Sequence, residues 1–381
     1  MKNITILGST GSIGQNALEV VRHFPSEFHV VGLSTNSNVD ILERQIKEFK
    51  PLFAAVIDLK AAKKLESRLS CKTKIFAGNE GLNFLVSEKK VDRILLAISG
   101  SAALMPLLKA LDCDKQVALA NKEALVMAGP LIAQRAKNRF KRIIPVDSET
   151  CAIWQCLEGK NKDDLKNIYL TGSGGPFRNA SKRQLKDASV SKVLKHPKWK
   201  MGKKITVDSA TLMNKGLELL EVMFLFGVSL EKIKILIHPE SVIHSMVEFI
   251  DGTYLAQLSA TDMRLPIQYA LSYPEKLPSS FLGIDFYKLK ELHFERPDFK
   301  KFPCLELAVQ AASSLGTMPC VLNAANEVCV AAFLKNRLEF LAIAKVIRMT
   351  LDAHRNITKP DLGDILEADI WAREKARRII G

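Results

Sequence analysis

The sequence predicts an α/β protein built from a Rossmann-like domain, an α+β domain and a C-terminal helical bundle. Three observations predict this class. A β-prone segment at the N-terminus runs into a glycine-rich turn and a helical pattern, strand-like and helix-like segments alternate as far as residue 146, and helical periodicity prevails from residue 303. Alternating strands and helices are typical of a mainly parallel sheet covered by helices.

The length and composition are those of a multidomain globular protein. The chain has 381 residues, more than one ordinary domain holds, and 47% of them are hydrophobic and 25% charged. We expect a cytoplasmic protein, because no apolar run approaches the ~18–20 residues of a membrane span and the N-terminus lacks the apolar core of a signal peptide. The seven cysteines form no C-x-x-C pair, which favours reduced thiols over disulfides or zinc ligands.

The net charge of +14 is compatible with anionic ligands. It is also compatible with nucleic-acid binding, but the Lys and Arg residues are spread along the chain and only five Tyr and three Trp are available to stack on bases. We therefore expect a small-molecule ligand and neither a nucleic acid nor a membrane as partner.

The N-terminal segment predicts a dinucleotide site. Residues 2–7 alternate as a strand does, Gly8-Ser9-Thr10-Gly11-Ser12-Ile13-Gly14 follows, and residues 15–22 have a helical pattern. Glycines in this position allow a tight turn and let the backbone approach a pyrophosphate at the helix N-terminus. The spacing is G-x-x-G-x-x-G rather than the commoner G-x-G-x-x-G, so a plain strand–helix turn stays an alternative.

The second strand, residues 28–33, indicates which dinucleotide. An NAD site usually carries Asp or Glu near the end of this strand, where it binds the ribose 2′-hydroxyl. Here the strand is followed by Ser34-Thr35-Asn36-Ser37-Asn38, which holds no acid. Hydroxyl, amide and backbone N–H groups accept a 2′-phosphate that a carboxylate would repel. The sequence therefore favours NADP over NAD.

The alternation then continues along the chain. We expect strands at 53–57, 93–98, 117–120 and 142–146, and helices at 41–49, 60–69, from 102 and from 124. Lys122 follows the strand at 117–120, which is where ligands bind in open α/β sheets. An ion pair with Glu123 or contact with solvent is the alternative role for this lysine.

Two carboxylates follow the last of these strands. If the backbone stays extended through Asp147 and Glu149, their side chains point the same way and form half of a Mg²⁺ or Mn²⁺ site. A surface loop with two solvated acids is the alternative for this pair taken alone. Further on, a helix from Asn214 would place Lys215 and Glu218 within one turn of each other. Its first turn suits a phosphate, and Glu218 supplies a third carboxylate or instead pairs with Lys215.

The remaining segments predict anion contacts and a helical end. Thr171 to Phe177 is a small-residue loop that can present backbone N–H groups and hydroxyls to an anion, with a flexible hairpin turn as the alternative. The basic stretch 191–204 carries Trp199 and predicts a lid over a ligand, with a basic surface loop anchored by this Trp as the alternative. His238 and His244 lie too far apart for one helix face and favour structural roles. A strand is expected at 253–259, an extended linker at 272–300, and helices at 304–315, 323–336, 340–354 and 362–379.

With these segments in place, the sequence resembles the 1-deoxy-D-xylulose 5-phosphate reductoisomerases over nearly its whole length. The resemblance is carried by long motifs in the family's order: LGSTGSIG at 7–14, LANKEALV at 119–126, PVDSE at 145–149, LTGSGGPF at 170–177, HPKWKMGKKITVDSATLMNKGLE at 196–218, IHPESVIHSMV at 237–247 and NAANEV at 323–328. One departure is Asn36-Ser37, where the family often has Gly and a basic residue before the asparagine at 38.

The resemblance implies a set of site residues and a homodimer. It implies Asp147, Glu149 and Glu218 as ligands of Mg²⁺ or Mn²⁺. It implies Ser173, Ser209, Asn214 and Lys215 on the substrate phosphate, with Lys122, Ser148 and His196 on the other substrate oxygens and Trp199 and Met201 in a mobile flap. It implies NADPH contacts from Thr10, Gly11, Ser12, Ile13, Asn38, Asn121, Glu123 and Gly202, to which the glycine turn adds Gly8 and the end of the second strand adds Ser37.

The resemblance also implies the domain plan and the reaction. The plan is an NADPH domain at 1–146, a catalytic domain at 147–271, a linker at 272–300 and a helical bundle at 301–381. The reaction is a skeletal rearrangement of a ketose phosphate followed by hydride reduction, in the non-mevalonate (MEP) route to isoprenoids. Lys122, Glu149 and a metal-bound water all stay open as proton carriers.

Two other classes of function remain as alternatives. A semialdehyde dehydrogenase would need a cysteine nucleophile, for which Cys151 and Cys156 are the nearest candidates. A non-catalytic NADP-binding sensor would need no convergent carboxylates.

Overall fold

The computed structural model describes residues 1–69, 72–136, 142–195, 202–279, 281 and 283–381, which fold as two compact units. The first unit contains Met1–Ala124, Ile132–Cys151 and Asp262–Phe281, and the second contains Leu125–Leu131, Ala152–Thr261 and Leu282–Gly381. Within the described part of the chain, every helix is too short or too polar to cross a lipid bilayer.

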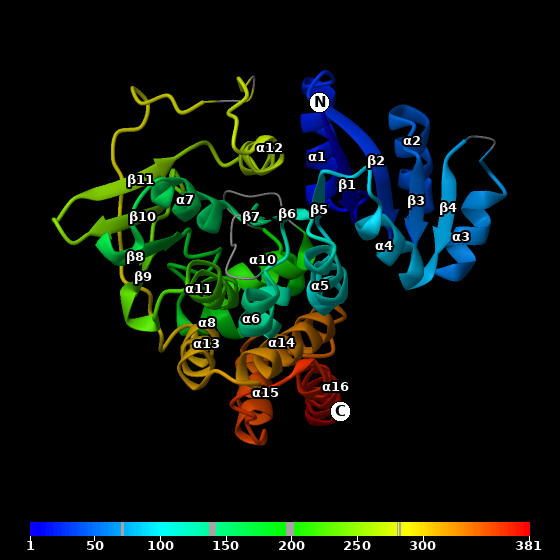
Figure 1. Ribbon diagram of the computed structural model, residues 1–381. Helices are drawn as coiled ribbons and strands as arrows, with labels where there is room; N and C mark the ends of the chain where they lie inside the picture. The colour runs from blue at the N-terminus through cyan, green and yellow to red at the C-terminus, as the bar shows by residue number, and fades with distance from the viewer. Residues whose placement is uncertain (70–71, 137–141, 196–201, 280, 282) are drawn as a thin grey trace. The chain divides into compact units, whose positions relative to one another are not determined.

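The first unit is built on a parallel sheet of seven strands in the order β4-β3-β2-β1-β5-β6-β7 (Figure 1). The strands are β1 (Lys2–Leu7), β2 (Phe28–Thr35), β3 (Phe53–Val56), β4 (Lys74–Ala77), β5 (Arg93–Leu96), β6 (Gln116–Leu119) and β7 (Ile143–Pro145). Most of their residues are buried, because helices cover both faces of a parallel sheet of this kind. The predicted Rossmann-like class is confirmed.

Helices connect these strands. They are α1 (Ser12–His23), α2 (Val39–Phe49), α3 (Leu59–Glu66), α4 (Gly78–Ser87), α5 (Leu104–Asp112) and α6 (Glu123–Arg135). A further helix of this unit, α12 (Arg264–Ser272), comes much later in the chain and connects no strands of this sheet. Helix α5 is preceded by a 3₁₀ turn at Gly100–Ala103. The sequence patterns did not indicate β4 and α4, since β4 has only four residues and exposes the first and last of them.

The strand order reverses beside β1, and this reversal places the glycine turn. β1 pairs with β2 on one side and with β5 on the other, so the chain leaves the carboxyl ends of β1 and β5 in opposite directions, towards β2 and towards β6. Gly8 follows β1 with φ +85°, and a Cβ on it would lie 2.6 Å from the carbonyl oxygen of Ala97, just after β5. Only glycine combines this backbone with this contact. The turn therefore lies where open α/β sheets bind ligands.

The second unit combines a four-stranded mixed sheet with helices. The sheet has the order β11-β10-β8-β9, from β8 (Leu165–Gly172), β9 (Ile233–Ile237), β10 (Ile243–Phe249) and β11 (Tyr254–Leu258). The chain also forms α7 (Ser148–Leu157), α8 (Lys182–Lys186), α9 (Val190–Val193), α10 (Lys203–Ala210) and α11 (Met213–Phe226), with short 3₁₀ turns at Lys162–Asp164 and Leu230–Lys232.

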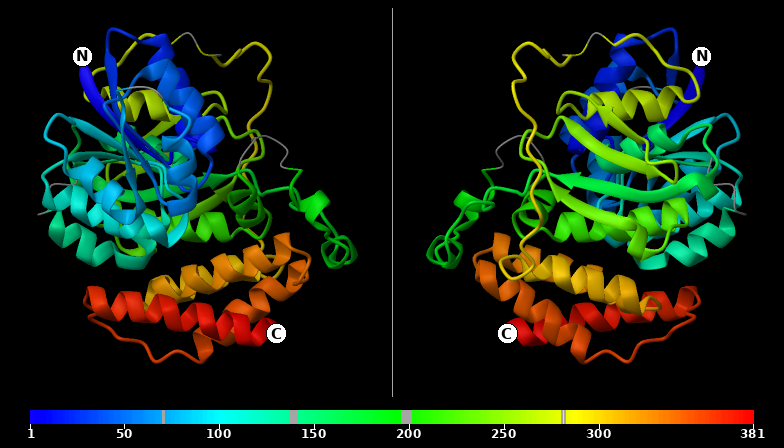
Figure 2. Two further views of the ribbon diagram at one scale, coloured as in Figure 1. Left: turned by 90° about the vertical axis from the view of Figure 1, so that its right-hand side faces the viewer. Right: turned by 90° about the vertical axis from the view of Figure 1, so that its left-hand side faces the viewer.

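Four helices at the C-terminus confirm the predicted helical region. They are α13 (Pro303–Ser314), α14 (Met318–Leu334), α15 (Phe340–Asp352) and α16 (Leu362–Ile380), and they lie together in Figure 2. Helix α14 packs against both α15 and α16. It is the most apolar of the four and is buried along most of its length, whereas α16 starts with a capping box between Asp361 and Asp364.

A buried guanidinium fixes the end of α12 to the sheet of the first unit. Arg93 of β5 is 2% exposed and donates to the carbonyl oxygens of Ala270 and Leu271, each at 2.7 Å, and of Tyr273 at 2.9 Å. Burial lowers the pKa of Arg93 to about 10, so the group stays charged at neutral pH. A cation at the last carbonyls of a helix satisfies acceptors that the helix itself leaves without donors.

We expect the substitution Arg93→Met to lower the stability of the first unit markedly. It would leave several buried carbonyl groups without donors, at about 3 kcal/mol in total, which corresponds to a fall of roughly 6–12 °C in melting temperature for a unit of this size. Differential scanning calorimetry measures the shift. The matched control is Arg22→Met, because Arg22 forms an exposed ion pair with Glu48 and such pairs contribute little. Equal shifts for the two variants would contradict this account.

Candidate functional site

The glycine turn prepares the N-terminus of α1 for an anion. Gly11 is the residue before α1 and has no side chain that could cap the first N–H groups, and the first turn contains no acid. The turn is anchored to the end of β2, since Ser9 N–H donates to Ser34 O at 2.8 Å and the Thr10 and Thr35 hydroxyls are 2.6 Å apart. Gly11 and Ser12 are exposed and Ile13 is half-buried.

The end of β2 agrees with the NADP prediction in its local chemistry. Ser37 and Asn38 are exposed just beyond this strand. Asn38 begins α2 by accepting the N–H of Ile41 at 3.3 Å, which is a typical capping role for asparagine. The side chains here are a hydroxyl and an amide, and α2 places its first acid, Asp40, beyond them in an ion pair with Arg68 at 2.6 Å.

Asn121 ties two strand ends together. Its amide nitrogen lies within 3.0 Å of the carbonyl oxygens of Ile98 and Gly100, and 2.9 Å from the carboxylate of Glu123. Its amide oxygen accepts the N–H of Ala124 at 2.8 Å, at the start of α6. These contacts show that Asn121 and Glu123 form one buried group at the carboxyl edge of the sheet. Whether they also contact a cofactor remains a prediction.

Lys122 is directed to the acids that follow β7. Its side chain is 6% exposed, and its Nζ lies 3.0 Å from Oδ1 of Asp147. The contact joins the loops after β6 and β7, which are neighbouring strands in the sheet. The alternatives left open for this lysine were Glu123 and solvent, and the structure gives Asp147 as a partner. An ammonium group in this position lowers the free energy of a carboxylate that is largely shielded from water.

The predicted extended backbone at Asp147 and Glu149 is wrong. Helix α7 begins at Ser148, so Glu149 lies in its first turn and Asp147 immediately precedes it, with its carbonyl accepting the N–H of Cys151 at 2.8 Å. The two acids therefore do not share a face through strand alternation. An acid in a first helical turn is favoured by the helix dipole, which the two-residue spacing does not reveal. The Ser148 hydroxyl donates to Glu149 at 2.6 Å.

The helix predicted from Asn214 is confirmed as α11, and it carries a compact polar group. Glu218 is fully buried, Lys215 is 5% exposed, and both Asn214 and Lys215 donate to the Glu218 carboxylate. The helix is preceded by Leu212 in a left-handed conformation, with φ 58° and ψ 11°, which separates it sharply from α10. A leucine rarely adopts this conformation, and such strain is found mainly at functional sites.

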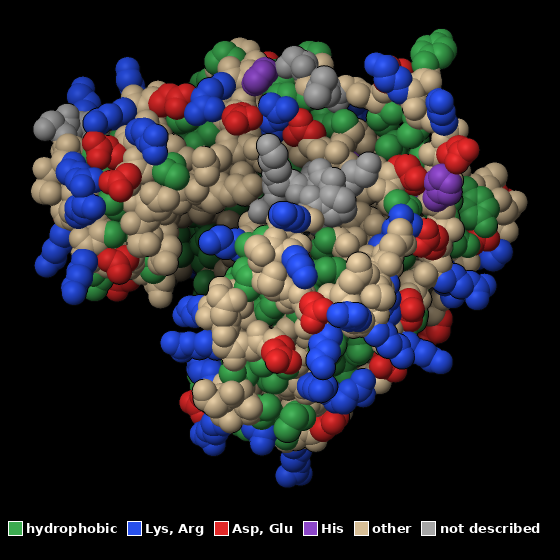
Figure 3. Space-filling view, turned by 180° about the vertical axis from the view of Figure 1, so that it is seen from behind, with side chains coloured by type: hydrophobic (Ala, Val, Ile, Leu, Met, Phe, Trp, Pro, Cys, Tyr) green, Lys and Arg blue, Asp and Glu red, His purple; other side chains and the backbone are tan. Residues whose placement is uncertain are grey.

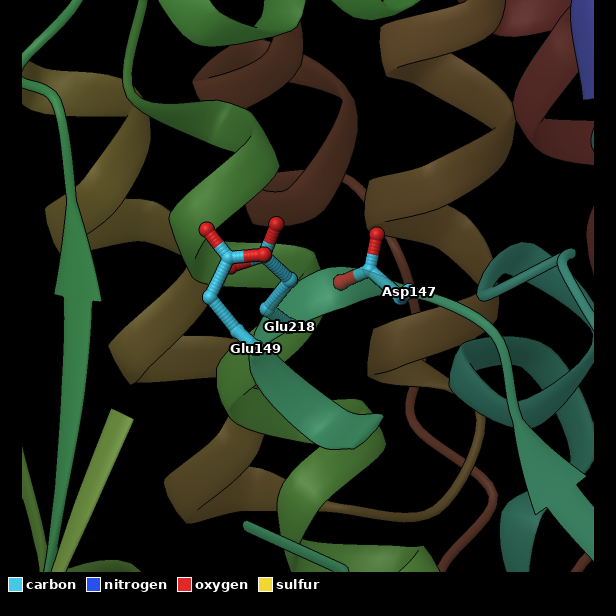
Figure 4. A group of neighbouring side chains, drawn as sticks. All are labelled: Asp147, Glu149 and Glu218. Carbon is cyan, nitrogen blue, oxygen red and sulfur yellow. The ribbon is translucent and has the colours of Figure 1, made fainter. Parts of the chain in front are cut away.

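Three carboxylates converge. Asp147, Glu149 and Glu218 each offer one carboxylate oxygen, and these oxygens lie within 4.8 Å of one another (Figure 4). The first two are half-buried and the third is buried. Hard carboxylate oxygens at this spacing fit Mg²⁺ or Mn²⁺.

The loop after β8 lies against the segments that carry the predicted phosphate ligands. A Cβ on Gly172 would lie 2.6 Å from Cε of Lys215, and a Cβ on Gly175 would overlap the carbonyl oxygen of Ser209. Ser173 lies between these glycines, and its hydroxyl accepts the Gly175 N–H at 3.2 Å. Ser173, Ser209 and Lys215 are thus close in space. The sequence indicated an anion-binding loop here but not its packing, which depends on residues far along the chain, the side chain of Lys215 and the backbone of Ser209.

Other predicted positions have simpler outcomes. His196, Trp199 and Met201 lie outside the described residues, and Gly202 is the exposed residue before α10. The structural role predicted for His238 is consistent with its burial and its contacts. Its Nε2 accepts the N–H groups of Val242 and Ile243 at 3.2 Å, and its Nδ1 lies 2.9 Å from the His293 carbonyl oxygen.

The cysteines do not favour the dehydrogenase alternative. Cys151 and Cys156 are buried in α7, and burial raises the pKa of Cys156 to about 11, so that its thiol is protonated at neutral pH. The cysteines among the described residues form no disulfide with one another. On the face drawn in Figure 3, Lys and Arg side chains are interspersed with Asp and Glu rather than gathered in one band.

Comparisons with known proteins match nearly the whole chain to one family. The sequence model of the 1-deoxy-D-xylulose 5-phosphate reductoisomerase family matches residues 4–129, and two family models of the C-terminal domains of these enzymes match residues 143–226 and 258–375. The reductoisomerase of Thermodesulfovibrio yellowstonii is 51% identical over 381 residues, covering 100% of both chains. That of Caldanaerobacter subterraneus is 50% identical over 379 residues, covering 99% of both chains.

Solved structures agree. The reductoisomerase from Zymomonas mobilis in complex with NADPH matches with a TM-score of 0.92 and 40% identity, covering 100% of this chain and 99% of that one. A reductoisomerase structure with NADPH, fosmidomycin and magnesium matches with a TM-score of 0.94 and 38% identity, covering 100% of this chain and 98% of that one. The chain therefore belongs to the 1-deoxy-D-xylulose 5-phosphate reductoisomerase family.

Proposed function

We propose that this protein converts 1-deoxy-D-xylulose 5-phosphate into 2-C-methyl-D-erythritol 4-phosphate, using NADPH and a divalent metal ion, in the MEP route to isoprenoids. The observation that carries the proposal is the convergence of Asp147, Glu149 and Glu218 within 4.8 Å. A non-catalytic NADP sensor has no need for this group. Full-length relatives that carry the reductoisomerase name support the same reaction.

The three carboxylates would hold the metal ion. When bound, Mg²⁺ or Mn²⁺ supplies a Lewis acid that polarises a carbonyl oxygen and orients the substrate. Lys122, through its contact with Asp147, and Lys215, through its contact with Glu218, hold these carboxylates in place. Ser148, by donating to Glu149, does the same for the third.

The phosphate would bind where three segments meet. Ser173 comes from the loop after β8, Ser209 from the end of α10, and Asn214 and Lys215 from the start of α11. The glycine contacts described above bring the first two segments and the lysine together. A phosphate held here supplies binding energy remote from the reacting carbons, which the enzyme uses to orient them. Lys122, Glu149 and a metal-bound water remain the candidates that move protons.

NADPH would lie along the glycine turn. Its pyrophosphate would meet the N-terminus of α1 at Gly11, Ser12 and Ile13, next to Gly8 and Thr10, and its 2′-phosphate would meet Ser37 and Asn38. Further contacts are proposed for Asn121, Glu123 and Gly202. His196, Trp199 and Met201 are proposed to contact and cover the substrate, as the resemblance to the family implies.

The domain roles and the assembly belong to the same proposal. Residues 1–146 would bind NADPH, 147–271 would carry the chemistry, 272–300 would link, and 301–381 would form the helical bundle of a homodimer. Equilibrium sedimentation measures directly whether the protein is a dimer.

The substitution Glu149→Gln should abolish metal-dependent turnover. Removing one of three anionic ligands weakens a hard cation site and displaces the substrate oxygens that depend on it, and we expect activity to fall by about 100-fold or more. NADPH oxidation at 340 nm with 1-deoxy-D-xylulose 5-phosphate, with and without Mg²⁺ or Mn²⁺, measures the effect. Glu367→Gln, an exposed change on α16, is the control.

A second readout of this prediction needs no turnover. The melting temperature of the wild type should rise on addition of Mn²⁺, and that of Glu149→Gln should not. If the two proteins respond equally to the metal, the carboxylates do not form the site. If the folded wild type oxidises no NADPH with either metal, the assigned substrate is wrong.

The substitution Lys215→Met should weaken phosphate recognition. A charge-assisted hydrogen bond is worth about 1.5–3 kcal/mol, so we expect a rise of roughly 10- to 150-fold in the KM for the sugar phosphate. The KM for NADPH should change little. Lys203→Met, an exposed lysine on α10, is the control, and a comparable loss in that variant would point to the general positive charge of the protein instead.

The substitution Ser37→Asp should shift cofactor preference. A carboxylate at the end of β2 repels a 2′-phosphate and can accept a ribose hydroxyl, so kcat/KM for NADPH should fall by about tenfold or more while that for NADH holds or rises. The two constants are compared at fixed ionic strength. Parallel losses with both cofactors would mean that Ser37 does not lie near the 2′ position.

A further inference from the structure

A buried hydrogen bond connects α10 to the C-terminal helices. The amide nitrogen of Asn326, on α14, lies 2.8 Å from Oδ1 of Asp208, on α10, across 118 residues of sequence. Asn326 is fully buried and Asp208 is 1% exposed. A carboxylate only accepts hydrogen bonds, so the amide must present its nitrogen to it. The other oxygen of Asp208 lies 2.7 Å from the ammonium of Lys204, one turn earlier on α10.

The chemistry of this contact is unusual for its surroundings. Helix α14 is the most apolar of the C-terminal helices, and Ala325, Cys329 and Val330 around Asn326 are almost completely buried. Asparagine is a poor helix former, and burying its amide is unfavourable by about 1–3 kcal/mol unless it finds a partner. An apolar residue would pack at least as well. The asparagine therefore does something at this position that packing alone does not require.

Asp208, the acceptor of this hydrogen bond, lies one residue from Ser209 of the proposed phosphate site, which consists of Ser173, Ser209, Asn214 and Lys215. Asp208 precedes Ser209, whose carbonyl oxygen lies against Gly175 in the loop that carries Ser173. Helix α10 packs against α14, and its position therefore determines where both serine hydroxyls lie. α10 has only eight residues and ends in the sharp left-handed break at Leu212, so the helix is too short to hold its own position.

A second contact links the C-terminal helices to α11, which carries Asn214 and Lys215 of the same phosphate site. Gly216, next to Lys215 on α11, faces Ala308 of α13 so closely that a Cβ on the glycine would overlap that of the alanine. This contact is apolar and fixes only how near the helices lie. The Asn326–Asp208 bond is directional, so it also fixes rotation and register of α10.

We propose that Asn326 and Asp208 are positioning residues for substrate recognition, acting through Ser209 and the Ser173 loop. The bond holds α10 in the register at which both hydroxyls meet the phosphate of the substrate. The inference rests on the proposed function, because it names that phosphate as the ligand. Neither residue touches the substrate itself.

The test compares two asparagines on one helix. Asn326→Leu removes the donor to Asp208 and keeps a side chain of similar size. Asn323→Leu makes the same change one turn earlier, at a fully buried residue that donates to Glu327 of its own helix at 3.0 Å. We expect about a tenfold rise in the KM for 1-deoxy-D-xylulose 5-phosphate in the first variant only. The KM for NADPH and kcat should each stay within about twofold.

The exchanged pair Asp208→Asn with Asn326→Asp is the rescue. It restores an amide opposite a carboxylate with the direction of donation reversed, so it should reverse most of the rise in KM that Asn326→Asp alone causes by setting two carboxylates against each other. The pair also replaces Asn326→Leu if that variant does not fold. Equal effects of the two leucine variants, or no recovery in the exchanged pair, would overturn the positioning role.

Hydrogen exchange provides a readout that is independent of turnover. In Asn326→Leu, the amides of residues 205–212 should lose about tenfold or more of their protection, and those of α1 should not change. If the wild type is inactive on the sugar phosphate but this loss of protection occurs, the proposed substrate is wrong and the positioning bond stands. If the enzyme is active and the protection is unchanged, the inference is wrong and the proposed function stands.

Discussion

The constraint on which the rest of the site depends is the repulsion among three carboxylates gathered in partly buried surroundings. Oxygens within 4.8 Å of one another repel by about 3 kcal/mol per charged pair at an effective dielectric constant near 20. Groups this close cannot all be ionised unless positive charge lies beside them. The chain supplies it in three forms: Lys122 at Asp147, Lys215 at Glu218, and the N-terminus of α7 at Glu149.

The lysines that balance these carboxylates are also placed where a phosphorylated substrate would need them. A lysine paired with a proposed metal ligand is also suitably charged to meet an anionic substrate. Lys215 illustrates this, because it contacts Glu218 and also passes over Gly172 in the proposed phosphate loop. A side chain fixed by one partner loses less conformational entropy when it binds another. The charges that make the acidic group tolerable therefore also prepare the site for a phosphorylated substrate.

The sequence predicted the parts of the fold that depend on local patterns. The strand, glycine turn and helix at the N-terminus follow from periodicity and from the few conformations glycine turns allow, and α11 follows from its helical spacing. The geometry at Asp147 and Glu149 was predicted wrongly, because a two-residue spacing fits a strand end and a helix start equally well. The acids converge nevertheless, since the turn from β7 into α7 redirects the chain.

Contacts between distant segments could not be read from the sequence. In the sequence, Gly175 is an ordinary loop glycine and Arg93 an ordinary arginine at the end of a strand. Only the structure shows Ser209 packed against Gly175 and the carbonyl groups of α12 around Arg93. Local propensity carries no information on such partners. The indirect signal is a residue that disagrees with its own element, such as a charge inside an apolar strand.

Asn326 is the clearest case of that disagreement. Apolar packing tolerates small shifts and rotations of one helix on another, because dispersion forces have little directional preference. A buried amide facing a buried carboxylate does not tolerate such shifts, since any displacement breaks their hydrogen bond while both groups stay shielded from water. A short helix such as α10, which we propose presents the Ser209 hydroxyl to the substrate, benefits from such an all-or-none contact. The polar residue is thus best placed deep inside the helices, away from the ligand, where water cannot substitute for it.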